Sequence, residues 1–386
     1  MKVSILQENL NKGLSIVSRI INSKVTLPIL GNILLTAEEG KLKLTATNLE
    51  VSINLWLPAK KEKEGKFTIP AKDLTEFVNA LPADKVLLEE KQEKLQVVSG
   101  NYKAVFNGTS AAEFPHVPSL KDKKTSSNVG RKFELEVEEF VKAVNLVCFA
   151  AAQDETRPVL TGVRLSCLNN ELQLVATDGY RLSLKRIDLK EKLDIPTLII
   201  PARALVEVIK AIEQREKPAC TGREGEKKLQ VAVTKQINQV IFSYGNLEVI
   251  ARLIEGEFPD FQKIIPEKGE SKAVIDTEEL IRAVRTASIF ARKSANIVRL
   301  NFDKKMLTIK ANAPEIGENE IKIPVEFEGE KTEIAFNFRF LQDFLSYLDK
   351  ETLSVELSGA LKPGLFRGIK DNSFLHIIMP VRLQGE

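Results

Sequence analysis

Histidine and cysteine are scarce in this chain, whose 386 residues include two histidines and three cysteines: His116, His376, Cys148, Cys167 and Cys220. The cysteines are widely spaced, and their spacing fits no template for a zinc site. A small, odd number of cysteines is typical of a reducing compartment and argues against a disulfide scaffold. Because the two histidines are far apart in the sequence, we expect structural roles for them, with no histidine-based catalytic triad and no metal site.

The chain also lacks the segments that characterise several other protein classes. No hydrophobic run approaches the roughly 18 residues of a membrane-spanning helix. Charged side chains occur between Met1 and Glu8, so we expect no secretory signal peptide. The phosphate loop GxxxxGK(S/T), the nucleophile elbow GxSxG and the zinc motif HExxH are absent from the sequence. These absences favour a cytoplasmic binding protein with no cofactor over an enzyme or a membrane protein.

Charge of either sign is not in large excess. The chain has 56 Lys and Arg against 53 Asp and Glu, a net charge of +3. A protein that coats DNA non-specifically is basic throughout, and this total gives no evidence of that. A net charge near zero is still compatible with basic residues gathered on one face of the protein. At about 150 residues per domain, the length predicts two or three domains.

The sequence repeats itself three times. Apolar residues recur at i, i+4 and i+7 in three places, which corresponds to one face of an amphipathic helix. These residues are Leu10, Leu14 and Val17; Phe140, Val144 and Val147; and Leu280, Val284 and Ala287. A second helical pattern follows in each copy, led by Leu74, Leu205 and Leu341. Segments of alternating polarity, as in half-buried strands, follow each predicted helix.

Three copies in the same order predict three tandem similar domains of the α+β class. Each domain is expected to contain a helix, strands, a second helix and more strands. We place the domains at residues 1–125, 126–266 and 267–386. The polar stretches 121–131 and 266–272 are expected to be linkers.

Each predicted helix carries a base on the side away from its apolar face, because two residues of helix turn through about 200°. The bases are Lys12, Lys142 and Arg282 in the first helices and Lys72, Arg203 and Arg339 in the second, and Lys210, Arg285 and Arg292 extend the pattern. The ordinary alternative is a solvated face of mixed sign. However, a base in a first helical turn opposes the helix dipole at a cost of roughly 0.3–1 kcal/mol. Three such placements favour a surface that binds a polyanion through its phosphates.

Five motifs, distributed over the three copies, resemble those of the bacterial DNA polymerase III β-subunit family, the sliding clamps. They are Thr26–Asn32, Arg157–Gly162, Ala176–Leu182, Gly256–Asp260 and Met379–Leu383. The resemblance implies the DNA clamp fold, in which two chains close head-to-tail into a ring with helices lining the hole and sheets outside. It also implies a non-catalytic processivity factor that encircles double-stranded DNA and tethers the polymerase.

The same resemblance implies a hydrophobic pocket between the second and third domains that receives a short peptide motif. The implied partners are the DNA polymerase III α subunit, the clamp loader, and other polymerases and repair proteins that carry the peptide. The matching positions are Leu160, Thr177, Gly179, Tyr180, Arg181, Leu182, Pro259, Lys263, Ile264, Ser354, Ile377, Ile378, Met379, Pro380, Val381, Arg382 and Leu383. From the residues alone, a buried final strand is the more natural interpretation of Ile377 to Met379.

For the DNA-facing surface, the resemblance adds further positions to the bases already described. The full predicted set is Lys12, Lys24, Lys72, Lys142, Gln153, Arg157, Arg203, Lys210, Arg282, Arg285 and Arg339. The homodimer interface is expected to join the strand near Ala104 and Phe106 of one chain to the helix near Ile289 and Phe290 of the other.

Two other functions stay open from the sequence. A monomeric DNA-binding scaffold would keep the clamp fold without ring closure, and its mass in solution would identify it. A hydrolase with an unrecognised pair of carboxylates would reveal itself by hydrolysing a nucleotide.

Overall fold

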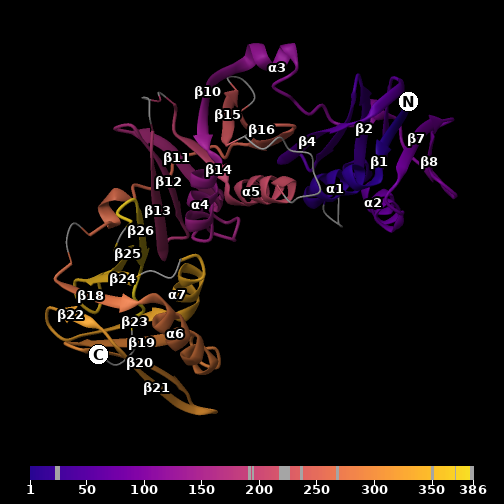
Figure 1. The fold of residues 1–386 in the computed structure, drawn as a ribbon. Helices are drawn as coiled ribbons and strands as arrows, with labels where there is room; N and C mark the ends of the chain where they lie inside the picture. Colours follow the sequence, from indigo (N-terminus) through magenta and orange to yellow (C-terminus); the bar gives the residue numbers. More distant parts are fainter. Residues whose placement is uncertain are drawn as a thin grey trace. The chain divides into compact units, whose positions relative to one another are not determined.

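The computed structural model describes residues 1–21, 27–189, 193, 195–216, 227–234, 238–266, 269–348, 352–369 and 371–382, with Lys123 and Lys124 described by their backbone alone. The chain divides into two compact units, and Figure 1 labels many of their elements. The first unit comprises Met1–Phe140 with Arg203–Leu253, and the second comprises Val141–Ala202 with Ile254–Glu386.

The first unit holds two antiparallel sheets. A five-stranded sheet has the order β5-β1-β7-β8-β9, and an eight-stranded sheet has the order β10-β15-β16-β17-β4-β3-β2-β6. The strands are β1 (Lys2–Leu6), β2 (Asn32–Glu38), β3 (Lys41–Thr47), β4 (Val51–Pro58), β5 (Lys60–Lys63), β6 (Gly65–Pro70), β7 (Lys85–Lys91), β8 (Lys94–Ser99), β9 (Tyr102–Asn107), β10 (Val129–Glu136), β15 (Lys228–Thr234), β16 (Gln239–Tyr244) and β17 (Leu247–Arg252). Because β17 pairs with β4, with Val249 opposite Ile53, the eight-stranded sheet joins the first two sequence repeats.

The second unit repeats this plan. Its nine-stranded sheet has the order β14-β11-β12-β13-β26-β25-β24-β18-β22, and its four-stranded sheet has the order β21-β20-β19-β23. The strands are β11 (Gly162–Leu168), β12 (Glu171–Thr177), β13 (Arg181–Asp188), β14 (Leu198–Pro201), β18 (Ser271–Asp276), β19 (Ile297–Asp303), β20 (Met306–Ala313), β21 (Gly317–Pro324), β22 (Glu326–Glu328), β23 (Thr332–Asn337), β24 (Thr352–Leu357), β25 (Gly364–Gly368) and β26 (Phe374–Ile378). Here β13 pairs with β26, so the second and third repeats also share one sheet.

Six of the described helices are the first and second helices of the three repeats. They are α1 (Gln7–Val17), α2 (Ala71–Ala80), α4 (Val137–Cys148), α5 (Ala202–Glu216), α6 (Thr277–Ala291) and α7 (Phe338–Leu345). In the first unit α1 packs on β3 and β4 beside α2, and in the second unit α6 packs on β19 to β21 beside α7. The three tandem similar α+β domains are therefore confirmed.

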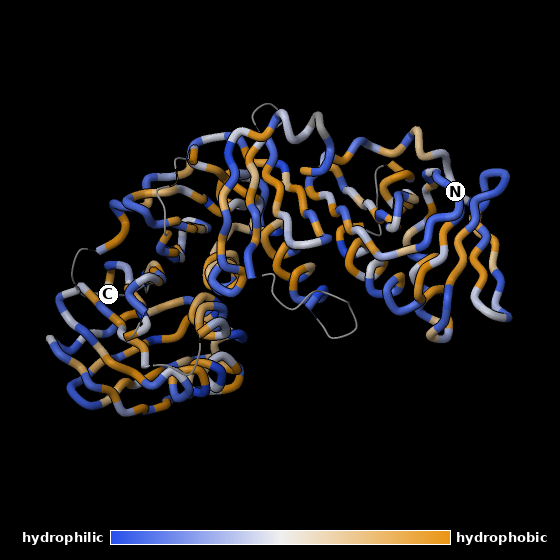
Figure 2. The backbone as a smooth tube through the Cα atoms, turned by 45° about the horizontal axis from the view of Figure 1, so that its top comes forward, coloured by the Kyte–Doolittle hydropathy of each residue, from blue (hydrophilic) through white to orange (hydrophobic). Residues whose placement is uncertain are grey.

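The predicted apolar positions face the cores. Leu10, Phe140 and Leu280, which lead the three first helices, are at most 1% exposed. Strand alternation is also as expected, since along many strands hydrophobic and hydrophilic colours alternate (Figure 2). In β20, for example, Leu307 and Ile309 are buried while the intervening Thr308 is half-buried. One face of each such strand packs on the core and the other meets solvent.

The expected linkers differ from the structure. Residues Lys123–Asn128 form the short helix α3, and Arg131 belongs to β10. Similarly, Lys272 lies inside β18. The polar side chains that suggested linkers belong instead to the edge strand β10 and to the exposed alternate positions of β18, which lies between β24 and β22. None of the helices in the described part of the chain is long and apolar enough to cross a bilayer.

Candidate functional site

Side chains hold the turn between β12 and β13, where several predicted peptide-binding residues lie. Thr177 Oγ1 donates to the carbonyl oxygen of Arg181 over 2.6 Å and accepts from the Gly179 N–H over 3.0 Å. Asp178 Oδ1 accepts from the N–H groups of Tyr180 and Arg181, at 2.9 and 3.0 Å. Gly179 has φ +91°, a conformation that glycine adopts without strain. The turn is therefore fixed before any ligand arrives.

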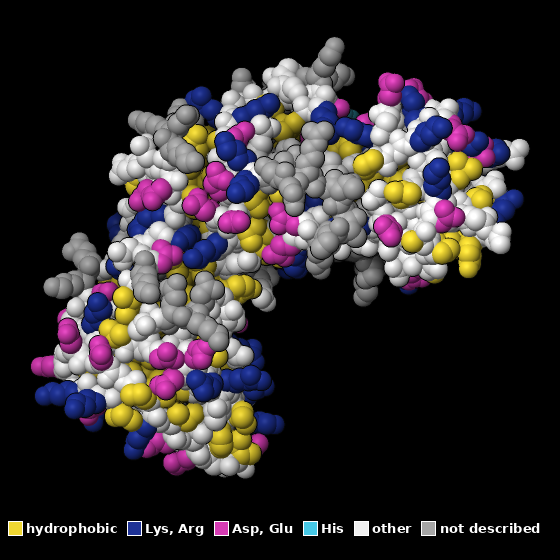
Figure 3. All heavy atoms as spheres, viewed as in Figure 1, with side chains coloured by type: hydrophobic (Ala, Val, Ile, Leu, Met, Phe, Trp, Pro, Cys, Tyr) yellow, Lys and Arg dark blue, Asp and Glu magenta, His cyan; other side chains and the backbone are white. Residues whose placement is uncertain are grey.

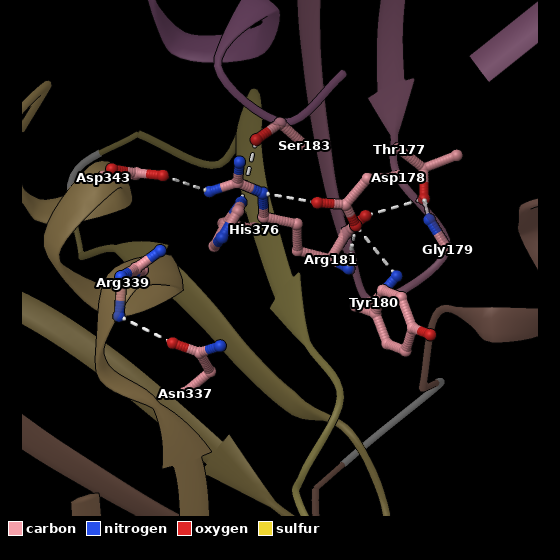
Figure 4. Close-up of polar contacts among 10 residues, drawn as sticks. All are labelled: Thr177, Asp178, Gly179, Tyr180, Arg181, Ser183, Asn337, Arg339, Asp343 and His376. Carbon is pink, nitrogen blue, oxygen red and sulfur yellow. Dashed lines mark hydrogen bonds and ion pairs between the residues drawn. The ribbon is translucent and has the colours of Figure 1, made fainter. Parts of the chain in front are cut away.

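Arg181 ties this turn to helix α7. Its side chain is 6% exposed, its Nε donates to Asp178 Oδ2 over 2.9 Å, and its Nη1 donates to Asp343 Oδ2 over 2.6 Å. Figure 4 shows the guanidinium between the two carboxylates. The guanidinium also lies 4.8 Å from the ring centre of Phe340 and 5.7 Å from that of Phe149. A buried cation is thus compensated by two anions and two aromatic rings.

His376 lies beside Arg181 and is fully buried. Its Nδ1 is 2.8 Å from the Ser183 hydroxyl, and its ring stacks on Phe344 with centres 4.6 Å apart. Burial, and secondarily the charge of Arg181, hold the pKa of His376 well below its ordinary value. The imidazole is therefore neutral in the folded chain, which agrees with the structural role expected of it.

Acidification is expected to destabilise the second unit through His376. The unfolded chain takes up a proton at this residue below about pH 6.5, whereas the folded chain resists protonation, so stability falls as the pH decreases. Between pH 7.5 and 5.5 this contribution is on the order of 1 kcal/mol. Urea unfolding at both pH values measures it, and His376→Phe, which keeps a ring on Phe344, should lack this part of the pH dependence. An identical pH dependence in the variant would assign it to other groups.

The structure brings several predicted pocket residues onto one face of the nine-stranded sheet. Thr177 pairs with Leu182, and Leu182 pairs with Ile377, so all three side chains point the same way. Leu182 and Ile377 belong to a buried cluster with Phe261. Six other predicted pocket residues are exposed: Gly179, Tyr180, Pro259, Lys263, Ile264 and Met379.

Three other chain segments carry further predicted pocket residues. Leu160 is buried in the 3₁₀ helix η4 (Pro158–Thr161), and Ile264 is 41% exposed in the 3₁₀ helix η5 (Gln262–Ile264). The Met379 N–H donates to the Tyr180 carbonyl oxygen over 2.8 Å, which places the segment after β26 against the turn. Pro380 and Val381 are half-buried, and Arg382 is exposed.

Three predicted pocket residues are placed elsewhere or lie outside the described part. Ile378 is fully buried in the core beneath α6 and α7, on the sheet face opposite Ile377. For Ile378 the buried-strand interpretation is therefore correct. Ser354 is buried in β24, opposite Arg367 of β25, with two strands between β24 and β13. Leu383 lies outside the described residues.

Sequence reasoning missed the partners of the turn on α7 and α4. Phe340 stacks on Tyr180 at 6.4 Å, and Asp343 anchors Arg181. Phe149 follows α4 and stacks on Tyr347. The aromatic run Phe338, Phe340 and Phe344 was visible in the sequence, but no local pattern connects it with a turn more than 150 residues earlier.

The predicted bases occupy equivalent helix positions in all three repeats. Lys12, Lys142 and Arg282 are the sixth residues of α1, α4 and α6. Lys72, Arg203 and Arg339 are the second residues of α2, α5 and α7. Lys and Arg are otherwise interspersed with Asp and Glu over the face seen in Figure 3, so helix position rather than total charge defines the pattern.

In the first unit the bases differ in their availability. Lys72 is exposed and lies 4.0 Å from Glu76, and Lys210 lies 3.7 Å from Glu207. Arg203 is exposed. Lys12 departs from the prediction of an outward base, because it is half-buried and its Nζ donates to the Arg215 carbonyl oxygen over 3.1 Å. Lys24 lies outside the described residues.

In the second unit the predicted DNA-facing side chains are exposed. These are Lys142, Gln153, Arg157, Arg282, Arg285 and Arg339. Arg282 lies 3.8 Å from Glu278. Arg339 follows Asn337, whose side chain accepts from the Arg339 N–H at the start of α7, as Figure 4 shows. That cap satisfies the backbone N–H of Arg339, and the Arg339 side chain is exposed.

The residues predicted to form a dimer interface lie at open sheet edges. Ala104 and Phe106 are half-buried in β9, an edge strand whose Val105 is 57% exposed. Ile289 is 54% exposed on α6, next to the half-buried Phe290, and α6 runs along the edge strand β21.

Metal chemistry has no visible site in the part of the chain that the structure describes. No group of three or more His, Cys, Asp and Glu side chains there could hold an ion.

Comparison with known proteins gives a consistent family. Models of the DNA polymerase III β subunit match its N-terminal domain to residues 1–118, its central domain to 134–260 and its C-terminal domain to 262–382. The β sliding clamp of Bacillus subtilis is 28% identical, covering 99% of this chain and 100% of the relative. The β sliding clamp of Synechococcus elongatus is 29% identical, with both chains covered completely.

Solved structures agree over the same length. The Bacillus subtilis DNA polymerase sliding clamp has a TM-score of 0.90 at 27% identity, with 99% of both chains covered. A Pseudomonas aeruginosa sliding clamp bound to griselimycin has a TM-score of 0.89 at 27% identity, covering 99% of this chain and all of the other.

Proposed function

This chain belongs to the DNA polymerase III β-subunit family, the sliding clamps, and on that premise we propose how it closes around DNA and receives its partners. It is a non-catalytic processivity subunit of DNA replication. Its function therefore depends on topology and on binding surfaces rather than on a chemical step.

We propose that two copies close head-to-tail into a ring. The sheets within the chain that join two repeats have eight and nine strands, whereas the sheets not shared between repeats have five and four. If β9 of one copy lies beside β21 of the other, these two sheets form one of nine strands. Such pairing would cover two exposed strand edges together with Val105 and Ile289. A head-to-tail contact that closes on itself gives a ring rather than a filament.

Duplex DNA is the proposed occupant of the ring. The observation that carries this proposal is the recurrence of bases at the second and sixth helix positions in all three repeats. Phosphate contacts of this kind position DNA without reading its sequence, so they permit sliding. Acids near several of these bases, such as Glu76 beside Lys72, would keep the contacts weak.

The turn at 177–182 and the apolar floor of Leu182 and Ile377 are the proposed peptide pocket. We propose that it receives short segments of the DNA polymerase III α subunit, the clamp loader, and other polymerases and repair proteins, in the cytoplasm. The griselimycin complex of the Pseudomonas aeruginosa relative supports a ligand site on this fold. A tethered polymerase then meets the primer end at a high effective concentration.

We also propose that the domains run over residues 1–125, 126–266 and 267–386. The family-model matches at 1–118 and 134–260 support the first two ranges. The third match begins at residue 262, slightly before the third range.

Retention on DNA tests encirclement. After loading by a clamp loader, the protein is expected to remain on a nicked circular plasmid through gel filtration and to leave the same plasmid once it is linearised. Loss from both forms at equal rates would favour the monomeric scaffold with no ring closure.

Charge reversal tests the helix bases in the same assay. The triple variant Lys72→Glu, Arg203→Glu and Arg339→Glu is expected to reduce retention on circular DNA at least about 10-fold, because each base contributes a phosphate contact. The helices should stay folded, since an acid in the first turn suits the helix dipole. The matched control reverses Lys66, Lys132 and Lys305, exposed bases on strands or hairpins, with the same change of net charge. Equal loss in both variants would mean that total charge, not helix position, determines retention.

A further inference from the structure

A second cleft opens on the sheet face that carries the proposed peptide pocket. It has a volume of about 470 Å³ and lies beside η5, and its lining includes Gln173, Leu184, Arg186, Phe261, Gln262 and Arg367. None of these residues is among the predicted pocket positions. The cleft therefore requires its own explanation.

The cleft adjoins the residues of the proposed pocket. Leu184 and Phe261 line it, and both belong to the same buried cluster as Leu182 and Ile377 of the pocket. Leu182 and Leu184 are two residues apart on β13, which is about 7 Å along a strand. On the other side, Gln262 of the cleft directly precedes Lys263 and Ile264 of the pocket. An extended chain of a few residues, at about 3.3 Å each, is enough to reach from one to the other.

The polar groups of the cleft suit a carboxylate. The lining includes two guanidinium groups, those of Arg186 and Arg367, and one carboxylate, that of Glu171, which lies 3.6 Å from Arg186. The Nε of Arg367 is buried and has no hydrogen-bond partner among the residues described. A buried donor without a partner is costly, and an arginine donor is best satisfied by a carboxylate.

Two further polar side chains are relevant: Ser354 pairs with Arg367 on the neighbouring strand, and Gln173 lines the cleft. Ser354, opposite Arg367 across β24 and β25, is 4% exposed, and within the described ranges its hydroxyl has no partner either. Gln173 is only 7% exposed although its side chain borders the cleft. A ligand carboxylate beside Arg367 would meet a positively charged wall above an apolar floor.

We infer that this cleft is a second subsite for the partner segment, which takes an acidic side chain adjacent in sequence to the anchors that fill the pocket. The inference rests on the proposed peptide pocket. It adds a specificity element, because a segment that has the apolar anchors but lacks the acid would bind less tightly. Ser354, which the sequence placed in the pocket, would contribute here instead.

Peptide binding to the full-length protein tests the inference by a double-mutant cycle. The first probe is a fluorescent synthetic peptide of about 15 residues from the clamp-binding segment of the same organism's polymerase α subunit. The second probe, the core peptide, is a shorter version that keeps only the residues that anchor in the proposed pocket. Each acidic residue of the longer peptide is replaced in turn by its amide. In the wild-type protein one replacement is expected to weaken binding about 10-fold, the loss of one charged hydrogen bond. In Arg186→Gln and Arg367→Gln that replacement should have no further effect.

The core peptide and a control variant separate the possible failures. Arg186→Gln and Arg367→Gln should bind the core peptide as the wild type does, which also shows that they are folded. Arg299→Gln removes an exposed arginine of the four-stranded sheet and should change neither peptide. If the core peptide does not bind wild-type protein, the proposed pocket is wrong. If it binds but the amide replacements and the arginine variants act independently, the cleft assignment is overturned. Binding of an oligodeoxynucleotide that both arginine variants lose would assign the cleft to nucleic acid and equally overturn it.

Discussion

Replacing Arg181 with methionine is expected to abolish measurable peptide binding, a loss of at least about 100-fold, and to destabilise the second unit by roughly 3 kcal/mol. Methionine keeps an apolar stem against Phe149 and Phe340 but leaves Asp178 and Asp343 without their cation. The side chain of Asp178 is 15% exposed and that of Asp343 is 48% exposed, so most of the destabilisation should come from Asp178. Since Asp178 also accepts both N–H groups that shape the turn, its displacement would open the turn.

A graded series distinguishes a positioning role from general unfolding. Asp343→Asn removes the charge of the more exposed partner and keeps its shape. We therefore expect it to lower the free energy of unfolding by about 1 kcal/mol or less, and to weaken peptide binding less than Arg181→Met does. Arg299→Met serves as the control, because Arg299 is exposed and its ion pair with Glu333 is 3.9 Å long. Urea unfolding and fluorescence anisotropy with the α-subunit peptide provide the two measurements. If Arg181→Met loses stability but binds the peptide as before, Arg181 supports the fold without positioning the pocket.

Local periodicity explains why the repeats and helix faces were predictable. Leu10, Phe140 and Leu280 were assigned to the core from spacing alone, and all three are buried. The turn before β13 also has a counterpart 130 positions earlier, where Thr47 and Asn48 accept backbone N–H groups as Thr177 and Asp178 do. Such features depend on neighbouring residues, so sequence patterns record them.

The features that escaped prediction depend on distant contacts. Arg181 meets Asp343, 162 positions away, and Lys12 meets the Arg215 carbonyl, 203 positions away. No periodicity indicates either partner, and the second contact turns a predicted outward base into a half-buried one. Ile377 and Ile378 show a different limit of prediction from sequence. Both are apolar, and only the pairing of β26 with β13 decides which of them reaches the pocket face.

Replacing Ile289 with aspartate is expected to convert the proposed ring into single chains. Ile289 is 54% exposed on α6, so the substitution should leave the folded chain nearly as stable as before, within about 0.5 kcal/mol. In the proposed ring the side chain would be buried against the partner's β9 edge, where an uncompensated carboxylate costs about 2 kcal/mol or more. A ring contains this contact twice, so the dissociation constant of the dimer should rise by roughly 10³-fold.

Solution mass and DNA retention measure this effect together. At micromolar concentration the wild type should sediment at twice the 43.1 kDa of one chain, and Ile289→Asp at 43.1 kDa. Ile369→Asp is the matched control, because Ile369 is 45% exposed after β25, in the same unit but on no proposed interface. The monomeric variant should also leave circular DNA as fast as linear DNA, whereas the control should stay on the circle. A variant that remains dimeric would place the interface elsewhere. A wild type of 43.1 kDa would favour the monomeric DNA-binding scaffold. A single chain can hold DNA only by direct contacts, and salt weakens these contacts.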